Sequence, residues 1–149
     1  MTAPVLKKLL GEGLAGFDES HGAPSRLYEL MESIVKLGAP LDGGQVGAIS
    51  TAVVARRVVD VDSVLGKLSV RVGTTGSAGQ TDVQVRVGAT LLAPTATVLN
   101  TDADGTTLSV DMGEAAVAAG QTVSIEVTAA PTAGADLDAT VGIRPASIE

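Results

Sequence analysis

The stretch LSVRVGTTGSAGQTDVQVRVG, residues 68–88, decides the fold. Apolar side chains occupy every second position in its first part and again in its last part, and a glycine-rich segment, residues 73–79, separates the two. Because successive side chains point to opposite faces of a strand, this period of two predicts two strands that each bury one face. The segment 73–79 predicts a turn between them, since it lacks the Gly-Lys-Ser/Thr ending of a phosphate-binding loop.

The same alternation extends along the rest of the chain after residue 49. A first strand region is expected around residues 56–61, and further alternating apolar positions are Leu108, Val110, Val123, Ile125, Val127, Leu137, Ala139, Val141 and Ile143. Six to eight short strands separated by turn residues predict a mainly β fold, a jelly-roll-like β-sandwich over residues 49–149, with the strands in meander-like order. The lack of a helical pattern after residue 50 excludes an α/β fold.

Residues 1–48 predict an N-terminal arm. One amphipathic helix is expected at about residues 26–37, with Ser25 as its N-cap and Gly38 and Pro40 at its end. Its apolar stripe consists of Leu27, Leu30, Met31, Ile34 and Val35. A helix this short is not stable alone, so the stripe must pack on the β-domain of the same chain or on a neighbour. Residues 38–48 predict a glycine-rich linker.

A second, smaller apolar face lies near the start of the arm. Val5, Leu6, Leu9 and Leu10 recur at helical spacing before Gly11. The two apolar faces of the arm are the candidate contacts with a protein partner.

Composition narrows the classes of function. The chain of 149 residues has a formal net charge of −7 and no cysteine, which disfavours binding to nucleic acid or to an anionic membrane and excludes thiolate chemistry. No apolar run is long enough for a transmembrane helix, and no signal peptide is apparent. Phe17 and Tyr28 are the only aromatic residues. A core of small aliphatic side chains is thin, so we expect stabilisation by subunit contacts in an oligomer.

Catalysis is not expected. The single histidine, His21, lies in a loop-like part of the arm, whereas a catalytic triad needs a histidine held beside its nucleophile. The many carboxylates are interpreted as solvated residues of turns and strand faces, because a glycosidase cleft also needs surfaces that grip sugar rings. The sequence therefore predicts a protein that is not an enzyme and has no cofactor.

Two polar features remain as alternatives. Asn100, Asp102, Asp104 and Asp111, with Gly105, follow the spacing of an EF-hand-type calcium loop, although the flanks predict strands and Asp-Gly is also typical of a hairpin turn. Four arginines, Arg56, Arg57, Arg71 and Arg86, could form a basic strip on a solvated sheet face or pair with acidic residues across strands.

Residues 68–88, the run AAGQTVSIEV at residues 118–127 and the last strand at 137–143 together resemble a β-domain of tailed-phage structural proteins. The resemblance covers roughly residues 65–145 and implies a head decoration (cement) protein, a head fibre or an upper tail-fibre module, often trimeric. The arm favours the first of these, because arms that become ordered on binding can wrap a large surface.

The leading hypothesis is therefore a bacteriophage capsid decoration protein on the outer surface of the virion. Its partner would be the major capsid protein, contacted through Val5, Leu6, Leu9, Leu10, Leu27, Leu30, Met31 and Ile34 in a homo-oligomer, with a trimer favoured. The alternatives are a fibre or spike module that binds the host surface and a calcium-dependent adhesion module.

Overall fold

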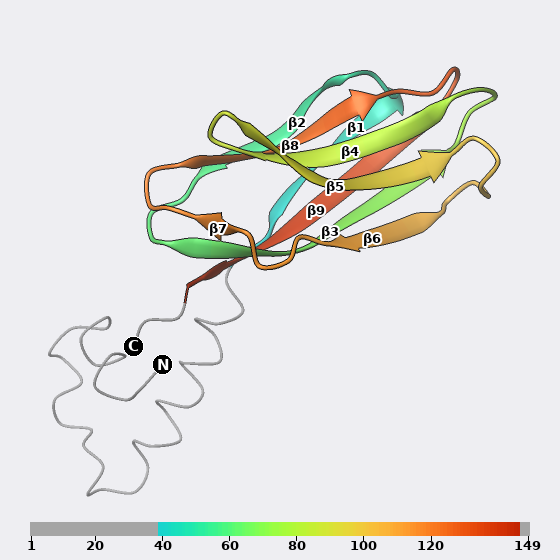
Figure 1. Cartoon of the computed structure of the whole chain (residues 1–149). Helices are drawn as coiled ribbons and strands as arrows, with labels where there is room; N and C mark the ends of the chain where they lie inside the picture. The colour runs from blue at the N-terminus through green and yellow to red at the C-terminus, as the bar shows by residue number, and fades with distance from the viewer. Residues whose placement is uncertain (1–38, 147–149) are drawn as a thin grey trace, which may run out of the picture.

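The computed structural model describes residues 39–146 of the chain. The predicted helix at 26–37 and both apolar faces of the arm lie outside the described residues. Within residues 39–146, nine strands form two antiparallel sheets that face each other (Figure 1), and these residues contain no helix. The prediction of a mainly β fold and a β-sandwich is confirmed.

The first sheet, sheet A, contains five strands. Its path runs in the order β1 (Leu41–Ala48), β9 (Ala135–Pro145), β3 (Ser63–Thr74) and β6 (Thr107–Asp111), and the short β7 (Ala116–Val117) pairs with the first residues of β3. The central position of β9 joins residues distant in sequence, for example Asp42 opposite Thr140.

The second sheet, sheet B, contains four strands. They run in the order β2 (Ala52–Val58), β8 (Thr122–Ala129), β4 (Gln80–Val87) and β5 (Thr90–Leu99). The hairpin between β4 and β5 turns at Gly88, whose φ of 57° is a conformation that glycine adopts readily.

The order of strands is not the predicted meander. Apart from the β4–β5 hairpin, strands adjacent in a sheet are not adjacent in sequence. Residues 73–79 lead from β3 in sheet A to β4 in sheet B, and residues 100–105 lead from β5 in sheet B to β6 in sheet A. Both segments are therefore crossovers between sheets and not hairpin turns.

The alternating residues form the core between the sheets. The largest fully buried side chains include Leu65, Leu68, Ile125 and Leu137, and the described residues contain no Phe, Tyr or Trp. Each buried aliphatic side chain contributes roughly 1.5–3 kcal/mol, so the stability of this mainly aliphatic core depends on the number of such residues. Four polar residues of the described chain are also buried, and Thr81 is the most buried of them: it is 0% exposed, and its Oγ1 has no hydrogen-bond partner among the described residues.

The sandwich begins earlier than predicted. Residues 41–48, expected to be a linker, form strand β1, and Leu41 is buried in the core. The glycines at positions 43 and 44 of β1 are explained by a lack of space for a side chain. A Cβ at Gly43 would lie 2.3 Å from the backbone oxygen of Val54 in β2, and one at Gly44 would lie 2.2 Å from the oxygen of Leu137 in β9. The boundary predicted at Ile49 is thus corrected to Leu41.

Candidate functional site

The outer face of sheet B carries an ordered ion pair. The guanidinium of Arg86 donates two hydrogen bonds to the carboxylate of Glu126, at 2.7 Å from Nε and 3.1 Å from one terminal nitrogen. The Ser124 hydroxyl also donates to Glu126, at 3.2 Å. The hydrogen bond from Arg86 lowers the pKa of Glu126 below its usual value. Both charges are therefore held in place by each other and are not directed into a cleft.

A second group of paired side chains lies further along the same face. Asp82 accepts hydrogen bonds from the Thr97 hydroxyl at 2.7 Å and from the Gln80 amide at 2.9 and 2.8 Å. Thr128 donates to Gln84 at 3.1 Å. Polar side chains of this face thus satisfy one another, within β4 for Gln80 and Asp82 and across strands for the other two pairs.

The outer face of sheet A is built in the same way from small polar residues. Thr140 donates to Asp42 at 2.6 Å, and the hydroxyls of Ser69 and Ser109 are 2.8 Å apart. The pairing register aligns these four residues in one row across four strands. The row therefore places two pairs of hydrogen-bonded polar side chains next to each other on this face.

The four arginines do not form one basic strip. Arg56 and Arg86 flank Ser124 on sheet B, whereas Arg71 lies on sheet A with a guanidinium nitrogen 3.7 Å from Asp138. Arg57 donates to the backbone oxygens of residues 39 and 40 at the edge of the sandwich. The topology divides them because β2 and β4 belong to one sheet and β3 to the other.

The carboxylates of the predicted calcium loop accept hydrogen bonds from other groups of the protein. Asp102 accepts from the Leu99 amide at 2.8 Å, and Asp104 accepts from the amide and hydroxyl of Thr75 at 2.9 and 3.2 Å. The side-chain amide of Asn100 donates a hydrogen bond to the Ser77 backbone oxygen at 3.3 Å. Asp111 lies at the far end of β6, opposite Lys67, and accepts from the Gly113 amide.

These contacts separate the predicted ligands. Within residues 39–146, no three acidic or histidine side chains gather in a way that could hold a metal ion. The carboxylates of the loop instead fix the crossover between the two sheets.

The loops at this end of the sandwich are tied to one another. Backbone hydrogen bonds join the loop after β3 to the loop after β8, from Ser77 to Thr132 and from Thr132 to Ala78, and another joins Ile49 to Gly134. Figure 1 shows the loops after β3, β5 and β8 together at the end opposite β7. This end, the loop end, is therefore a connected cap.

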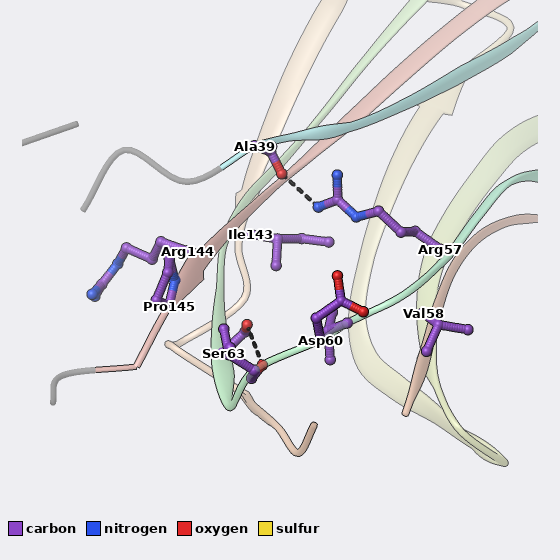
Figure 2. A pocket seen from close by; sticks show the side chains of 10 residues that line it. Ala39, Arg57, Val58, Asp60, Ser63, Ile143, Arg144 and Pro145 are labelled. Carbon is purple, nitrogen blue, oxygen red and sulfur yellow. Dashed lines mark hydrogen bonds between the residues drawn. The ribbon is translucent and has the colours of Figure 1, made fainter. Parts of the chain in front are cut away.

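A pocket lies at the opposite end, which we call the base. It has a volume of about 260 Å³ and a largely apolar lining. The lining comes from three segments: Ala39 before β1, residues 57–63 around the connection from β2 to β3, and residues 143–145 at the end of β9. Figure 2 shows Ile143 in the middle of this group, with Arg57 reaching the oxygen of Ala39.

The base pocket was not identified from the sequence. The sequence pattern predicts Val58 and Val61 as ordinary strand residues, yet they are 53% and 48% exposed and both line the pocket. The available signal was three apolar residues within Val58–Val61, which breaks the period of two. The predicted partner contacts at residues 5–10 and 27–34 lie outside the described residues.

The composition of the described residues is restricted. They contain no histidine, cysteine or aromatic residue. Within them there is also no helix of sufficient length and hydropathy to cross a bilayer. What the arrangement provides is a β-sandwich with paired polar side chains on both outer faces, a connected loop end and a pocket at the base.

Comparison with known proteins gives no family. No protein-family model and no curated protein matches the chain. Among solved structures, the chain is similar to the C-terminal domain of EclA, a sugar-binding protein, at 10% identity and a TM-score of 0.39, over 72% of this chain and 78% of that one. It is also similar to the Podospora anserina GH26-CBM35 β-(1,4)-mannanase, at 17% identity and a TM-score of 0.38, over 77% of this chain and 27% of the mannanase.

Proposed function

We propose that the chain is a structural protein of a bacteriophage particle. It acts as a capsid decoration (cement) protein on the outer surface of the head, where it binds neighbouring major capsid subunits. It is not an enzyme, needs no cofactor and contacts neither nucleic acid nor membrane. A homotrimer fits this role, because repeated contacts around a symmetry axis multiply weak affinities.

The observation that carries the proposal is the pairing of polar side chains on both outer faces. Arg86 with Glu126 and Thr140 with Asp42 satisfy each other across strands. Such faces suit a module that presents its surface to other proteins.

The topology is compatible with this role. With the two-residue β7 set aside, eight strands in the orders β1-β9-β3-β6 and β2-β8-β4-β5 correspond to a jelly roll, a fold used by viral capsid proteins and by lectins. The fold alone does not select between these two. The resemblance of residues 65–145 to tailed-phage β-domains favours the viral role.

A glycan-binding fibre or spike module is the main rival. Sugar rings are commonly gripped by aromatic surfaces, and residues 39–146 contain no aromatic residue. This composition favours a protein partner over a glycan.

The first experiment is quantitative mass spectrometry of purified particles from the source. A decoration protein is expected at one copy per major capsid subunit or at a simple fraction of that number. A handful of copies per particle would indicate a fibre or tail module, and absence from particles would overturn the viral role.

The second experiment tests the arm. Deletion of residues 1–24 is expected to abolish binding to capsid shells while the β-domain stays folded. A matched pair of variants of the full chain sharpens the test: Leu9→Ser with Leu10→Ser should weaken shell binding, and Lys7→Ser with Lys8→Ser should leave it largely intact. Normal binding by both the deletion and the leucine variant would refute a contact through the arm.

A further inference from the structure

Exposed apolar side chains gather at the base pocket. Six large hydrophobic residues are exposed in residues 39–146, and two of them, Val58 and Val61, line this one pocket beside Ile143 and Pro145. Leaving such apolar surface in contact with water is unfavourable. An apolar recess of this kind is expected to be covered.

The chain itself reaches the pocket at a fixed point. Ala39 lines the pocket, and its backbone oxygen accepts a hydrogen bond from Arg57 at 2.5 Å. Thirty-eight residues precede Ala39, and the predicted helical segment 25–37 ends just before it. Since an extended chain spans at most about 3.6 Å per residue, Ile34 lies within about 18 Å of Ala39 whatever its conformation.

Residues 25–37 carry an apolar stripe that could cover the apolar lining of the pocket. Its apolar stripe includes Leu30, Met31 and Ile34 at helical spacing. A helix of this length is not stable by itself and requires an apolar surface to pack against. The nearest such surface along the chain is the base pocket. Because the segment is joined to the pocket through Ala39, its effective concentration there is high, which favours a contact within the same chain.

We propose that the base pocket receives the apolar stripe of residues 25–37 of the same chain, with Ile34 and Leu30 against Val58, Val61 and Ile143. The stripe then belongs to the folded domain, and within the arm only residues 1–24 remain for a partner. This inference goes beyond the proposed function and does not rest on it, because it concerns the isolated protein.

The lack of cysteine permits a direct test in the full chain. The double variants Ile34→Cys/Val58→Cys and Leu30→Cys/Val58→Cys are expected to form an intrachain disulfide under mild oxidation, detected by mass spectrometry of the monomer band. The matched control is Ile34→Cys/Leu99→Cys, because Leu99 is 43% exposed but lies at the loop end. The control is expected to form no intrachain disulfide.

Each outcome decides the proposal. Disulfides between two chains would show that a second copy supplies the segment, and no disulfide in either pocket pair would show that the stripe lies elsewhere. Either result would overturn the proposal.

Limited trypsin digestion gives a second measurement in case the cysteine variants fold poorly. Arg26 and Lys36 flank the stripe, so docking should protect them. Val58→Ser with Val61→Ser should remove this protection, and Val53→Ser with Leu99→Ser should retain it. Equal cleavage in the wild-type chain and both serine variants would contradict docking in the pocket.

Discussion

Substitution of Gly43 tests whether β1 belongs to the sandwich as a tightly fitted strand. In Gly43→Ala, the new Cβ would lie 2.3 Å from the Val54 oxygen and 2.6 Å from the Cβ of Ala55. Normal contacts between such atoms need more than 3 Å, so the edge formed by β1 and β2 must separate. Overpacking of this kind costs about 1–3 kcal/mol, and the contact with backbone places the expected loss at the upper end of that range.

The matched control is Gly66→Ala in β3. A Cβ there would meet its nearest neighbour, the Cα of Gly142, at 3.8 Å, an ordinary contact. Alanine also loses less conformational entropy on folding than glycine, so this variant is expected to be neutral or more stable by about 0.5–1 kcal/mol.

Urea denaturation of the full chain measures both variants. The midpoint should fall for Gly43→Ala at an unchanged slope, and it should stay or rise for Gly66→Ala. Equal stabilities of the two variants would refute the close approach of β1 to β2 and restore the interpretation of residues 41–48 as a linker.

Further predictions concern the core, the charges and the loop. Ile125→Ala removes a fully buried side chain and should cost about 2–5 kcal/mol in chemical denaturation, whereas Val53→Ala, at an exposed position, should change stability by only about 0.5 kcal/mol; similar losses would contradict the assigned core. Thr81→Val replaces the unpartnered buried hydroxyl and should raise the free energy of unfolding by about 1 kcal/mol, and a clear loss would indicate a partner for Oγ1. Because the folded-state pKa of Glu126 is lowered, its stabilisation is present above the unfolded pKa and is lost as the pH falls through the folded value; the melting temperature of Glu126→Gln should therefore fall less on acidification than that of the wild type, and parallel curves would argue against the ion pair. Since Asp102 and Asp104 already accept amide hydrogen bonds, millimolar calcium and EDTA should give the same melting temperature, and a large rise with calcium would revive the adhesion module.

The period-two residues allowed the class of fold to be predicted from sequence. Leu68, Val83 and Ile125 are buried as their spacing indicated, because alternation is a local property of a strand with one buried face. Three strands were missed. The strand β7 has only two residues, too few for a period to show, and β1 and β5 were missed for local reasons. Gly43 and Gly44 resemble a linker, although they permit close approach of β1 to its neighbours. In β5, Pro94 lies where the register with β4 shifts, so the alternation is interrupted.

The assignment of strands to sheets could not be predicted, because it depends on contacts between residues far apart in sequence. The hydrogen bond from Thr140 to Asp42 joins positions 98 residues apart. The base pocket depends on the same long-range contacts, since it combines Ala39, Val58 and Ile143 from three segments. Local patterns identify each residue as apolar or polar but do not bring these segments together.

The central position of β9 also determines when the domain can fold. β9 is the last strand of the described residues, and it lies between β1 and β3 in sheet A. While the ribosome still holds residues 135–145, β1 has no neighbour in its sheet, and the nascent chain exposes unpaired strand edges that favour aggregation. Closure of the sandwich is therefore expected after synthesis of β9, on the millisecond-to-second timescale typical of folds dominated by long-range strand pairing. A ribosome-bound chain that ends before Ala135 should remain sensitive to protease, and release of the complete chain should bring resistance in a single step.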